Sequence, residues 1–253
     1  MLLAADNLHA LNPVFADALE RLDPNPVQTI AKQCEAAGAD LLDLNPGYLS
    51  RRKEDRMAFL VEAVQEVTSA RLILDSPNPR VLARGLEVCN ATPVLNALSL
   101  EKHKLDEILP LAVDHGTDLV LLLMDDRSFT PPSVEEKLAV AIELREHALH
   151  AGLKHENLIF DPVLPNLTWD DARFRVSECI KTVRFIASGS IFQEPAGTMI
   201  GLSNLRSGQS GRYPVRIEQD CLSVFAGAGL TIALANVLQP NLLDTYHALN
   251  GML

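Results

Sequence analysis

Short apolar segments recur along the chain, and each is followed by a longer stretch with apolar residues at helical spacing. The apolar segments are short, and most are rich in Leu, Ile, Val or Ala, which predicts buried strands. The expected strands are Leu2–Ala5, Leu41–Leu44, Arg71–Leu74, Pro93–Ala97, Leu119–Leu123, Leu158–Phe160, Thr198–Leu202 and Thr231–Leu234. Between them, stretches such as "VQTIAKQCEAAG" and "SVEEKLAVAIELREHALHAG" carry apolar residues at positions i, i+3 and i+4 and end in glycine, as helices commonly do.

The strand segments are nearly continuous apolar runs, and such runs are typical of a parallel sheet buried on both faces. Eight strand–helix units in 253 residues predict an α/β fold, a single (β/α)8 TIM barrel. An open, doubly wound sheet is the alternative, but no glycine-rich dinucleotide fingerprint follows the first strand. Without an interdomain linker or a low-complexity segment, one domain spanning residues 1–253 is expected.

Polar residues follow the expected strands, at the barrel end where active sites of this fold are built. They are almost all Asp or Asn, and hardly any Lys, His or Glu stands among them. In chain order they are Asp6, Asn7, Asp43, Asn45, Asp75, Ser76, Asn78, Asn96, Asp125, Asp126, Asp161, Ser203 and Asn204. Asp and Asn are also ordinary turn and capping residues, but capping admits Ser and Thr equally, so the bias toward Asp and Asn points to a site.

The chemistry of this set favours a flat heterocycle over a metal or a phosphate. A metal site would call for clustered carboxylates or His, and His147 and His150 lack the Glu of a HExxH motif, so we expect them to be exposed helix residues and no metal to be bound. A carboxylate can accept two parallel hydrogen bonds from the amine and ring N–H of an aminopyrimidinone, and an Asn amide can donate and accept beside it. A pterin presents such an edge.

Charge and composition narrow the class of protein. With 22 Lys and Arg against 33 Asp and Glu, the net charge is −11, which argues against nucleic acid or an anionic membrane as partner. The four cysteines lie tens of residues apart, so free thiols are expected. The sequence begins without a signal-peptide pattern, and no apolar run reaches the roughly 20 residues of a membrane span. A cytoplasmic enzyme is therefore expected.

Several motifs together resemble the methyltetrahydrofolate:corrinoid protein methyltransferases, which share a pterin-binding barrel with dihydropteroate synthase. The resemblance runs in order over nearly the whole chain. Its motifs are "DPNPVQTIAKQCEAAGADLLDLNPG" (23–47), "LVEAVQEV" (60–67), "LILDSPNP" (72–79), "LNALSLEK" (95–102), "LPLAVDHGTDLVLL" (109–122), "IFDPVLP" (159–165) and "GLSNLRSG" (201–208). The chain departs from the family pattern in "AADNLH", "LNA" and "MDDRSFTPP", around the expected rim of the site.

The resemblance implies that Asp75, Asn96 and Asp161 hold the pterin ring and that Asn204 lies beside the pterin N5 atom. Asn204 and Asp161 are the expected catalytic residues. Further expected pterin contacts are Asp43, Asn45, Ser203 and Asn7. The substrates implied are tetrahydrofolate or 5-methyltetrahydrofolate and a corrinoid (cobalamin) on a separate protein. The resemblance also implies a homodimer that exchanges a methyl group between them in one-carbon metabolism. The direction of transfer stays open.

The sequence leaves two alternative functions open. Dihydropteroate synthase shares the Asp and Asn of the pterin site, but "NPGYLSRR", "GLSNLRSG" and "LANVLQP" stand where that enzyme has a "GESTRPG"-like loop, a Lys and an Arg-x-His. The other is a non-catalytic subunit that binds a pterin or a corrinoid protein. Arg206 and Arg212, in the Gly- and Ser-rich loop 205–216, either meet the folate tail or the partner or lie in a solvated loop.

Overall fold

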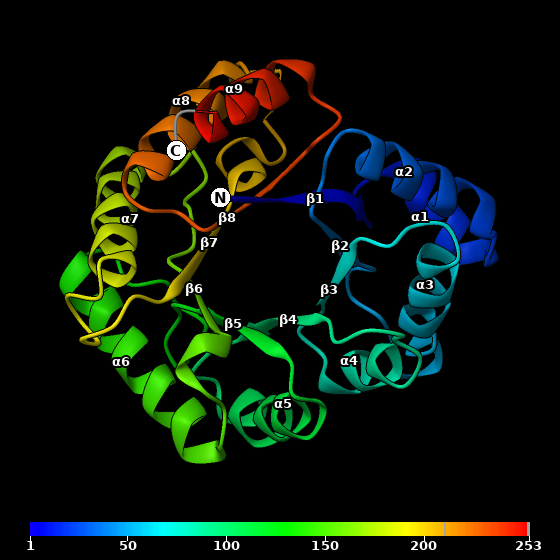
Figure 1. The fold of residues 1–253 in the computed structure, drawn as a ribbon, viewed down its shortest axis with the longest axis horizontal. Helices are drawn as coiled ribbons and strands as arrows, with labels where there is room; N and C mark the ends of the chain where they lie inside the picture. Colours follow the sequence, from blue (N-terminus) through cyan, green and yellow to red (C-terminus); the bar gives the residue numbers. More distant parts are fainter. Residues whose placement is uncertain (210, 252–253) are drawn as a thin grey trace.

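Strand and helix alternate along the whole chain of the computed structural model, which describes residues 1–209 and 211–251. Within these residues, eight parallel strands close into a barrel in the order of the sequence, and the helices surround it (Figure 1). The strands are β1 (Leu2–His9), β2 (Leu41–Asn45), β3 (Arg71–Asp75), β4 (Val94–Leu98), β5 (Asp118–Leu122), β6 (Leu158–Asp161), β7 (Gly197–Gly201) and β8 (Ile232–Ala235). The predicted barrel is confirmed.

The helices that follow the strands are α1 (Pro13–Arg21), α2 (Pro24–Ala36), α3 (Arg56–Gln65), α4 (Pro79–Leu86), α5 (Lys102–His115), α6 (Val134–Ala151), α7 (Ala172–Ala187), α8 (Arg216–Gly227) and α9 (Pro240–Asn250). Short 3-10 helices lie at η1 (Arg51–Lys53), η2 (His155–Asn157) and η3 (Leu202–Arg206). Sequence signals set the long helices: Ser133 and Glu136 form a capping box at the start of α6, and Gly152 ends it with φ 109. Gly116 ends α5 in the same left-handed region.

The seven strands after β1 begin and end within one residue of the prediction, and two differences bear on the site. The first strand was expected to end at Ala5, but β1 continues to His9, so Asp6 and Asn7 lie inside it. Its pairing with β2 shifts register between Ala5 and Leu8 and then resumes, because the strand carries a bulge. At the other difference, β7 ends at Gly201 and the chain enters η3, which places Ser203 and Asn204 in a 3-10 turn.

The barrel interior is closed at one level by a small apolar core with one residue from each strand. These residues are Ala4, Leu41, Ile73, Val94, Val120, Ile159, Met199 and Ile232. The larger core lies between the outer faces of the strands and the helices, and it includes Phe15, Leu42, Leu60 and Phe225, all fully buried. The barrel is therefore a packed core with a floor, as this fold requires, and not a pore.

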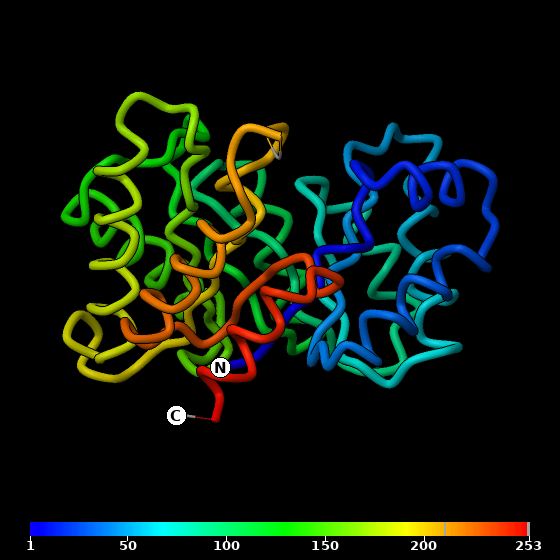
Figure 2. The backbone as a smooth tube through the Cα atoms, turned by 90° about the horizontal axis from the view of Figure 1, so that it is seen from above, coloured from blue at the N-terminus to red at the C-terminus, as the bar shows by residue number. Residues whose placement is uncertain are grey.

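The first residue lies at the end of the barrel where the strands begin. Tyr246 and Asn250 of α9 donate hydrogen bonds to the Met1 carbonyl, and Tyr246 also donates to Asp40. Figure 2 shows the N-terminus at one end of the molecule and the segment near residue 205 at the opposite end. No helix among the described residues is long and apolar enough to cross a membrane.

Candidate functional site

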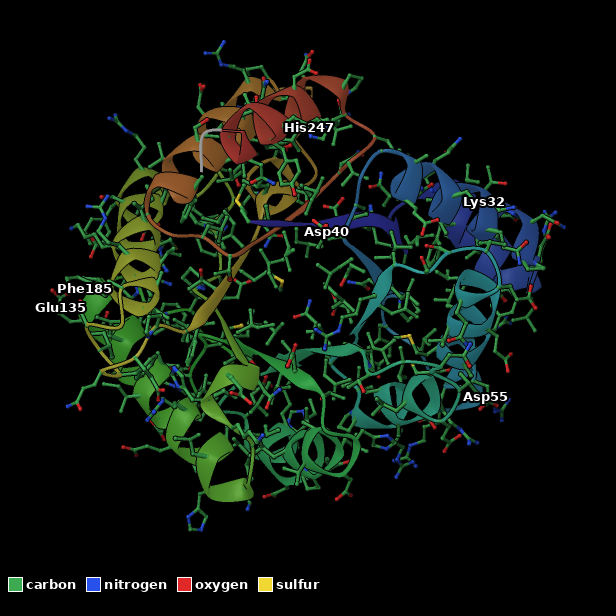
Figure 3. The ribbon with its side chains drawn as sticks, viewed as in Figure 1. Lys32, Asp40, Asp55, Glu135, Phe185 and His247 are labelled. Carbon is green, nitrogen blue, oxygen red and sulfur yellow. The ribbon has the colours of Figure 1, made fainter. Side chains whose placement is uncertain are left out.

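The alternation of side chains along a strand places a second layer directly above the apolar floor. Moving two residues along each strand from the floor residue keeps the side chain on the inner face. The second layer is Asp6, Asp43, Asp75, Asn96, Leu122, Asp161, Gly201 and Leu234. Four carboxyls and one amide thus project into the barrel at one level; in Figure 3 the strand side chains fill the ring centre, whereas Lys32 and Asp55 lie on the outer helices.

This layer forms the bottom of a cavity of about 740 Å³. Its walls come from the segments that follow the strands. Besides the second layer, they are His9, Ala10, Leu11, Asn45, Gly47, Pro77, Ala97, Lys104, Ser203, Asn204, Arg206, Ser207, Gly208, Glu218, Asn236 and Gln239. The cavity opens at the carboxyl ends of the strands, where enzymes of this fold bind their substrates.

Asp75 is held in place by Asn45 of the neighbouring strand. The Asn45 amide Nδ2 donates to Asp75 Oδ2 over 2.7 Å, and Asn45 Oδ1 accepts from the Gly47 amide over 2.9 Å. Burial raises the pKa of Asp75 to about 7, against the effect of the Asn45 hydrogen bond and with the help of the Asp161 charge. Near neutral pH the protonated and ionised forms of this carboxyl are therefore both populated.

Asp43 is the most strongly perturbed of the four carboxyls. Burial raises its pKa well above the usual value, and the nearby Asp75 and Asp6 raise it further, while a hydrogen bond with Asn96 acts in the opposite direction. Among the described residues its buried Oδ1 has no hydrogen-bond partner. The pKa of Asp6 is also raised, first by burial, although Ser203 shares a hydrogen bond with it. Close buried carboxyls cannot all be ionised, so this group holds protons at neutral pH.

Replacing Asp43 with asparagine is expected to stabilise the protein at pH 8 by about 1–3 kcal/mol, because the amide has the same size but cannot ionise inside the barrel. A carboxyl whose folded pKa is raised stabilises the fold below its unfolded pKa of about 4, and loses that contribution as pH rises through the folded pKa. Stability should therefore fall between pH 4 and 8 in the wild type and fall less in Asp43→Asn. Urea denaturation at several pH values measures this, with the exposed Asp114→Asn as control; equal slopes for wild type and Asp43→Asn would contradict it.

Asp161 ends β6 and is oriented by the turn that follows it. The Val163 amide donates to Asp161 Oδ1 over 2.7 Å. Burial raises the pKa of Asp161 to about 6, while the Val163 hydrogen bond and the ammonium of Lys137 lower it. The Val163 hydrogen bond and Lys137 both favour the ionised form of Asp161, which can accept hydrogen bonds from a ligand.

Asn204 reaches the cavity from η3, above the end of β7. Its carbonyl accepts from the Asn166 amide over 3.3 Å, which ties the turn to the segment after β6. A Cβ atom on Gly201 would lie 3.1 Å from Asn204 Nδ2, so a glycine there leaves room for the amide. In the described part of the chain the Asn204 side chain takes no protein hydrogen bond. Its donor and acceptor are therefore available to a ligand.

Two cations reach the cavity wall, and each is already paired. Lys104 forms an ion pair with Glu101 and donates to Ser99 over 3.1 Å. Arg206 Nε donates to the buried Glu218 over 2.7 Å, and its Nη1 donates to the Tyr213 carbonyl. The wall therefore suits a neutral, hydrogen-bonding ring better than a polyanion such as pyrophosphate.

The structure brings most of the predicted site residues together and separates Asn7 and Arg212 from them. Of the other polar residues that follow the strands, Ser76, Asn78, Asp125 and Asp126 do not line the cavity. Asp43, Asn45, Asp75, Asn96, Asp161, Ser203, Asn204 and Arg206 line the cavity. Asn7 does not line it: its Nδ2 donates to Asn236 and its Oδ1 accepts from the Val237 amide, so it links β1 to the segment after β8. Arg212 stacks on Tyr213 away from the wall, and Ser210 of the same loop lies outside the described residues. The solvated-loop interpretation is wrong for Arg206, which Glu218 binds.

The sequence analysis missed several wall residues that come from outside the strand ends. His9 was missed because β1 was expected to end early, and Glu218 because it lies on α8. Glu218 is 3% exposed and lies on the apolar face of α8. A charged residue at such a position in the sequence could have indicated that it belongs to the site. His147 and His150 are exposed on α6 as predicted, and the four cysteines are free.

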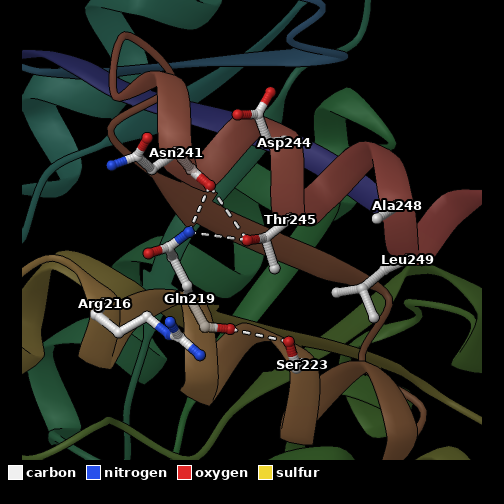
Figure 4. Close-up of a pocket in the computed structure, with 8 residues that line it drawn as sticks. All are labelled: Arg216, Gln219, Ser223, Asn241, Asp244, Thr245, Ala248 and Leu249. Atoms are coloured by element: carbon white, nitrogen blue, oxygen red, sulfur yellow. Dashed lines mark hydrogen bonds between the residues drawn. The ribbon is translucent and has the colours of Figure 1, made fainter.

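A second hollow, of about 530 Å³, lies outside the barrel between α8 and α9 (Figure 4). It is crossed by Gln219, which donates to the Asn241 carbonyl over 2.6 Å and to Thr245 over 3.0 Å. No group of three or more His, Cys, Asp or Glu able to hold a metal occurs in residues 1–209 and 211–251.

Comparison with known proteins adds a family and several relatives. The family described as pterin binding enzyme matches residues 12–234. A methylcorrinoid:tetrahydrofolate methyltransferase of Eubacterium limosum is 26% identical over 229 residues, which span 90% of this chain and 82% of that protein. The methionine synthase of Mycobacterium leprae is 26% identical over 201 residues, 77% of this chain but 16% of that longer protein.

Solved structures with this fold include dihydropteroate synthases. The enzyme of Yersinia pestis, with a bound sulfonamide drug, superposes with a TM-score of 0.71 at 16% identity, covering 99% of this chain and 93% of that one. The enzyme of Thermus thermophilus gives 0.67 at 21% identity, covering 98% and 93%. At such identities the likeness establishes the barrel fold and nothing about the reaction.

Proposed function

The chain belongs to the pterin-binding enzyme family, and on this premise we propose that it transfers a methyl group between N5 of tetrahydrofolate and the cobalt of a corrinoid carried on a partner protein. The observation that supports this most is the cavity itself. Buried, partly protonated carboxyls and a free amide meet at the mouth of a barrel whose wall cations are already paired. The similarity to a methylcorrinoid:tetrahydrofolate methyltransferase names the two substrates.

In this proposal Asp75, Asn96 and Asp161 bind the pterin ring. The aminopyrimidinone edge offers an exocyclic amine and a ring N–H, and the ionised Asp161 accepts from both. Asn96 and Asp75, which pair across β3 and β4, complete the hydrogen bonds to neighbouring ring atoms. Asn45 and Asp43 support these side chains, and Ser203 orients Asp6.

Asn204 is proposed to act at N5. When the methyl group leaves the folate, its bond to N5 breaks, the electron pair stays on the nitrogen, and N5 gains a proton. The carbon bonds to the cobalt of the second substrate, a reduced Co(I) corrinoid, which supplies the electron pair of the new bond and becomes methyl-Co(III). A donor already placed at N5 stabilises the charge where it develops. An Asn amide fits this task because it needs no protonation change of its own. We propose that the proton comes from solvent, with Asp43 or Asp161 in the path.

The same wall argues against the synthase alternative. A dihydropteroate synthase binds a pyrophosphate group, which calls for free Lys or Arg beside the pterin. Here Lys104 and Arg206 are paired with Glu101 and Glu218. The methyltransferase is therefore the function that the charges support best. The cytoplasmic location and the homodimer stay predictions.

Turnover is the direct test. Purified protein is mixed anaerobically with tetrahydrofolate and methylcobalamin, and the cobalt spectrum is followed as methylcobalamin is consumed. We expect demethylation that depends on both protein and tetrahydrofolate. Binding of tetrahydrofolate without turnover, with free methylcobalamin or with a methylated corrinoid protein, would indicate the non-catalytic subunit, and condensation of a pterin pyrophosphate with p-aminobenzoate would indicate the synthase.

A further inference from the structure

Lys137 is a fully buried lysine directly behind the cavity. It lies on α6 at the buried face that also carries Val134, Ala141 and Leu144, and it is 1% exposed. Its ammonium donates to the Pro162 carbonyl over 2.6 Å. Burial lowers the pKa of Lys137, while the charge of Asp161 favours its protonated form. A buried ammonium is costly, so its location beside the Asp161 turn calls for an explanation beyond packing.

The turn that Lys137 holds has an unusual backbone. Val163 has a φ of 59°, in the left-handed region that β-branched residues rarely occupy. Such a conformation persists only where its surroundings hold it. Here the Lys137 ammonium and the Cys179 thiol both reach the Pro162 carbonyl, and the thiol also lies 3.6 Å from the Val163 carbonyl. In this conformation the Val163 amide points at Asp161 Oδ1.

We infer that Lys137 is a positioning residue for Asp161: it fastens the turn that aims the carboxyl into the cavity and supplies the buried cation that keeps this carboxyl ionised. The inference rests on the proposed function only for the ligand that Asp161 binds. Charge and geometry act together, because the same ammonium that donates to Pro162 lies close enough to lower the pKa of Asp161. Lys137 thereby favours Asp161, among the inner carboxyls, as the acceptor of hydrogen bonds from a ligand.

Other titratable groups face this pair from each packed element. From α7 these are Arg175, Glu178 and Cys179, from α6 Glu136, and from β3 Asp75. Arg175 is occupied by Asp171 and the Thr130 carbonyl, and Glu178 by Lys181 and the Val134 amide. Lys137 is the cation whose ammonium reaches the turn itself.

The first test needs no ligand. Protein labelled with ¹³C at the Asp carboxyls is titrated by NMR, and Asp161→Asn identifies the Asp161 resonance. Lys137→Met should move the Asp161 midpoint up by about 0.5 to 1 pH unit, because the facing cation is lost. Lys137→Gln removes the charge but keeps a donor for the Pro162 carbonyl, and it should give the same shift. It serves as the test variant if Lys137→Met folds poorly.

A matched control comes from Lys181, a lysine of α7. It donates to Glu178 Oε1, whereas the Val134 amide donates to Oε2. Lys181→Met should leave the Asp161 midpoint unchanged. Circular dichroism confirms the fold of each variant. An unshifted midpoint in both folded Lys137 variants overturns the inference, since a lysine that serves only packing would leave the titration of Asp161 as it was.

The second test measures tetrahydrofolate binding by calorimetry between pH 5.5 and 8. Lys137→Gln should weaken binding about 3- to 10-fold more at pH 5.5 than at pH 8, because Asp161 becomes protonated at a higher pH. A uniform loss at all pH values would indicate a structural role alone and would overturn the inference. If the wild type does not bind tetrahydrofolate, the proposed function fails, while the carboxyl titration still decides the role of Lys137.

Discussion

Replacing Asp161 with asparagine is expected to weaken tetrahydrofolate binding by about 100-fold at pH 7.5. In the proposed complex the carboxylate offers its second oxygen to the two N–H donors of the pterin edge, while Oδ1 accepts from Val163. An amide in the same place turns an NH₂ group toward those donors or toward the Val163 amide. Losing hydrogen bonds to a charged acceptor costs about 1.5–3 kcal/mol, and 1.4 kcal/mol corresponds to tenfold in Kd.

The measurement is calorimetric titration of tetrahydrofolate under anaerobic conditions. Asp126→Asn is the matched control, because Asp126 follows the neighbouring strand β5 but its side chain is 77% exposed. Its affinity should stay within about twofold of the wild type, as for most surface substitutions. An Asp161→Asn variant that folds and binds as tightly as the control would remove Asp161 from the pterin site.

The barrel could be predicted because each strand carries its own apolar run and each helix its own spacing and cap. These are local signals, and they placed β2, β3 and β6 to within one residue. The end of β1 could not be predicted in the same way. Whether Asp6 and Asn7 continue the strand depends on pairing with β2 across a register shift, and that pairing is a contact between distant segments.

The candidate site was predicted in part for the same reason. Asp43, Asp75, Asn96 and Asp161 stand two residues beyond a floor residue, so the two-residue period of a strand brings them together. Asn7 sits one position from Asp6 and therefore points away from the cavity, toward Asn236. Lys137 and Glu218 lie on helices, and their approach to the site depends on how α6 and α8 pack.

The same reasoning assigns the largest kinetic effect to Asn204. Asn204→Ala is expected to slow methyl transfer by about 100- to 1000-fold, the usual loss when one preorganised donor is removed from a reacting centre. Binding of tetrahydrofolate should change by less than about threefold, because in the proposed complex Asp75, Asn96 and Asp161 hold the ring at a distance from N5. A fall in kcat without a matching rise in Kd is the signature of an interaction made mainly in the transition state.

Single-turnover spectroscopy of methylcobalamin gives the rate, and calorimetry gives the affinity, on the same preparations. Gln209→Ala is the control, since Gln209 follows in the same segment but does not line the cavity, and it should transfer at the wild-type rate. Asn204→Asp keeps the size and removes the donor, so it should be as slow as the alanine variant if donation to N5 is what matters. A fast aspartate variant would instead show that the donor is dispensable, and wild-type rates in Asn204→Ala would assign nitrogen activation to another group.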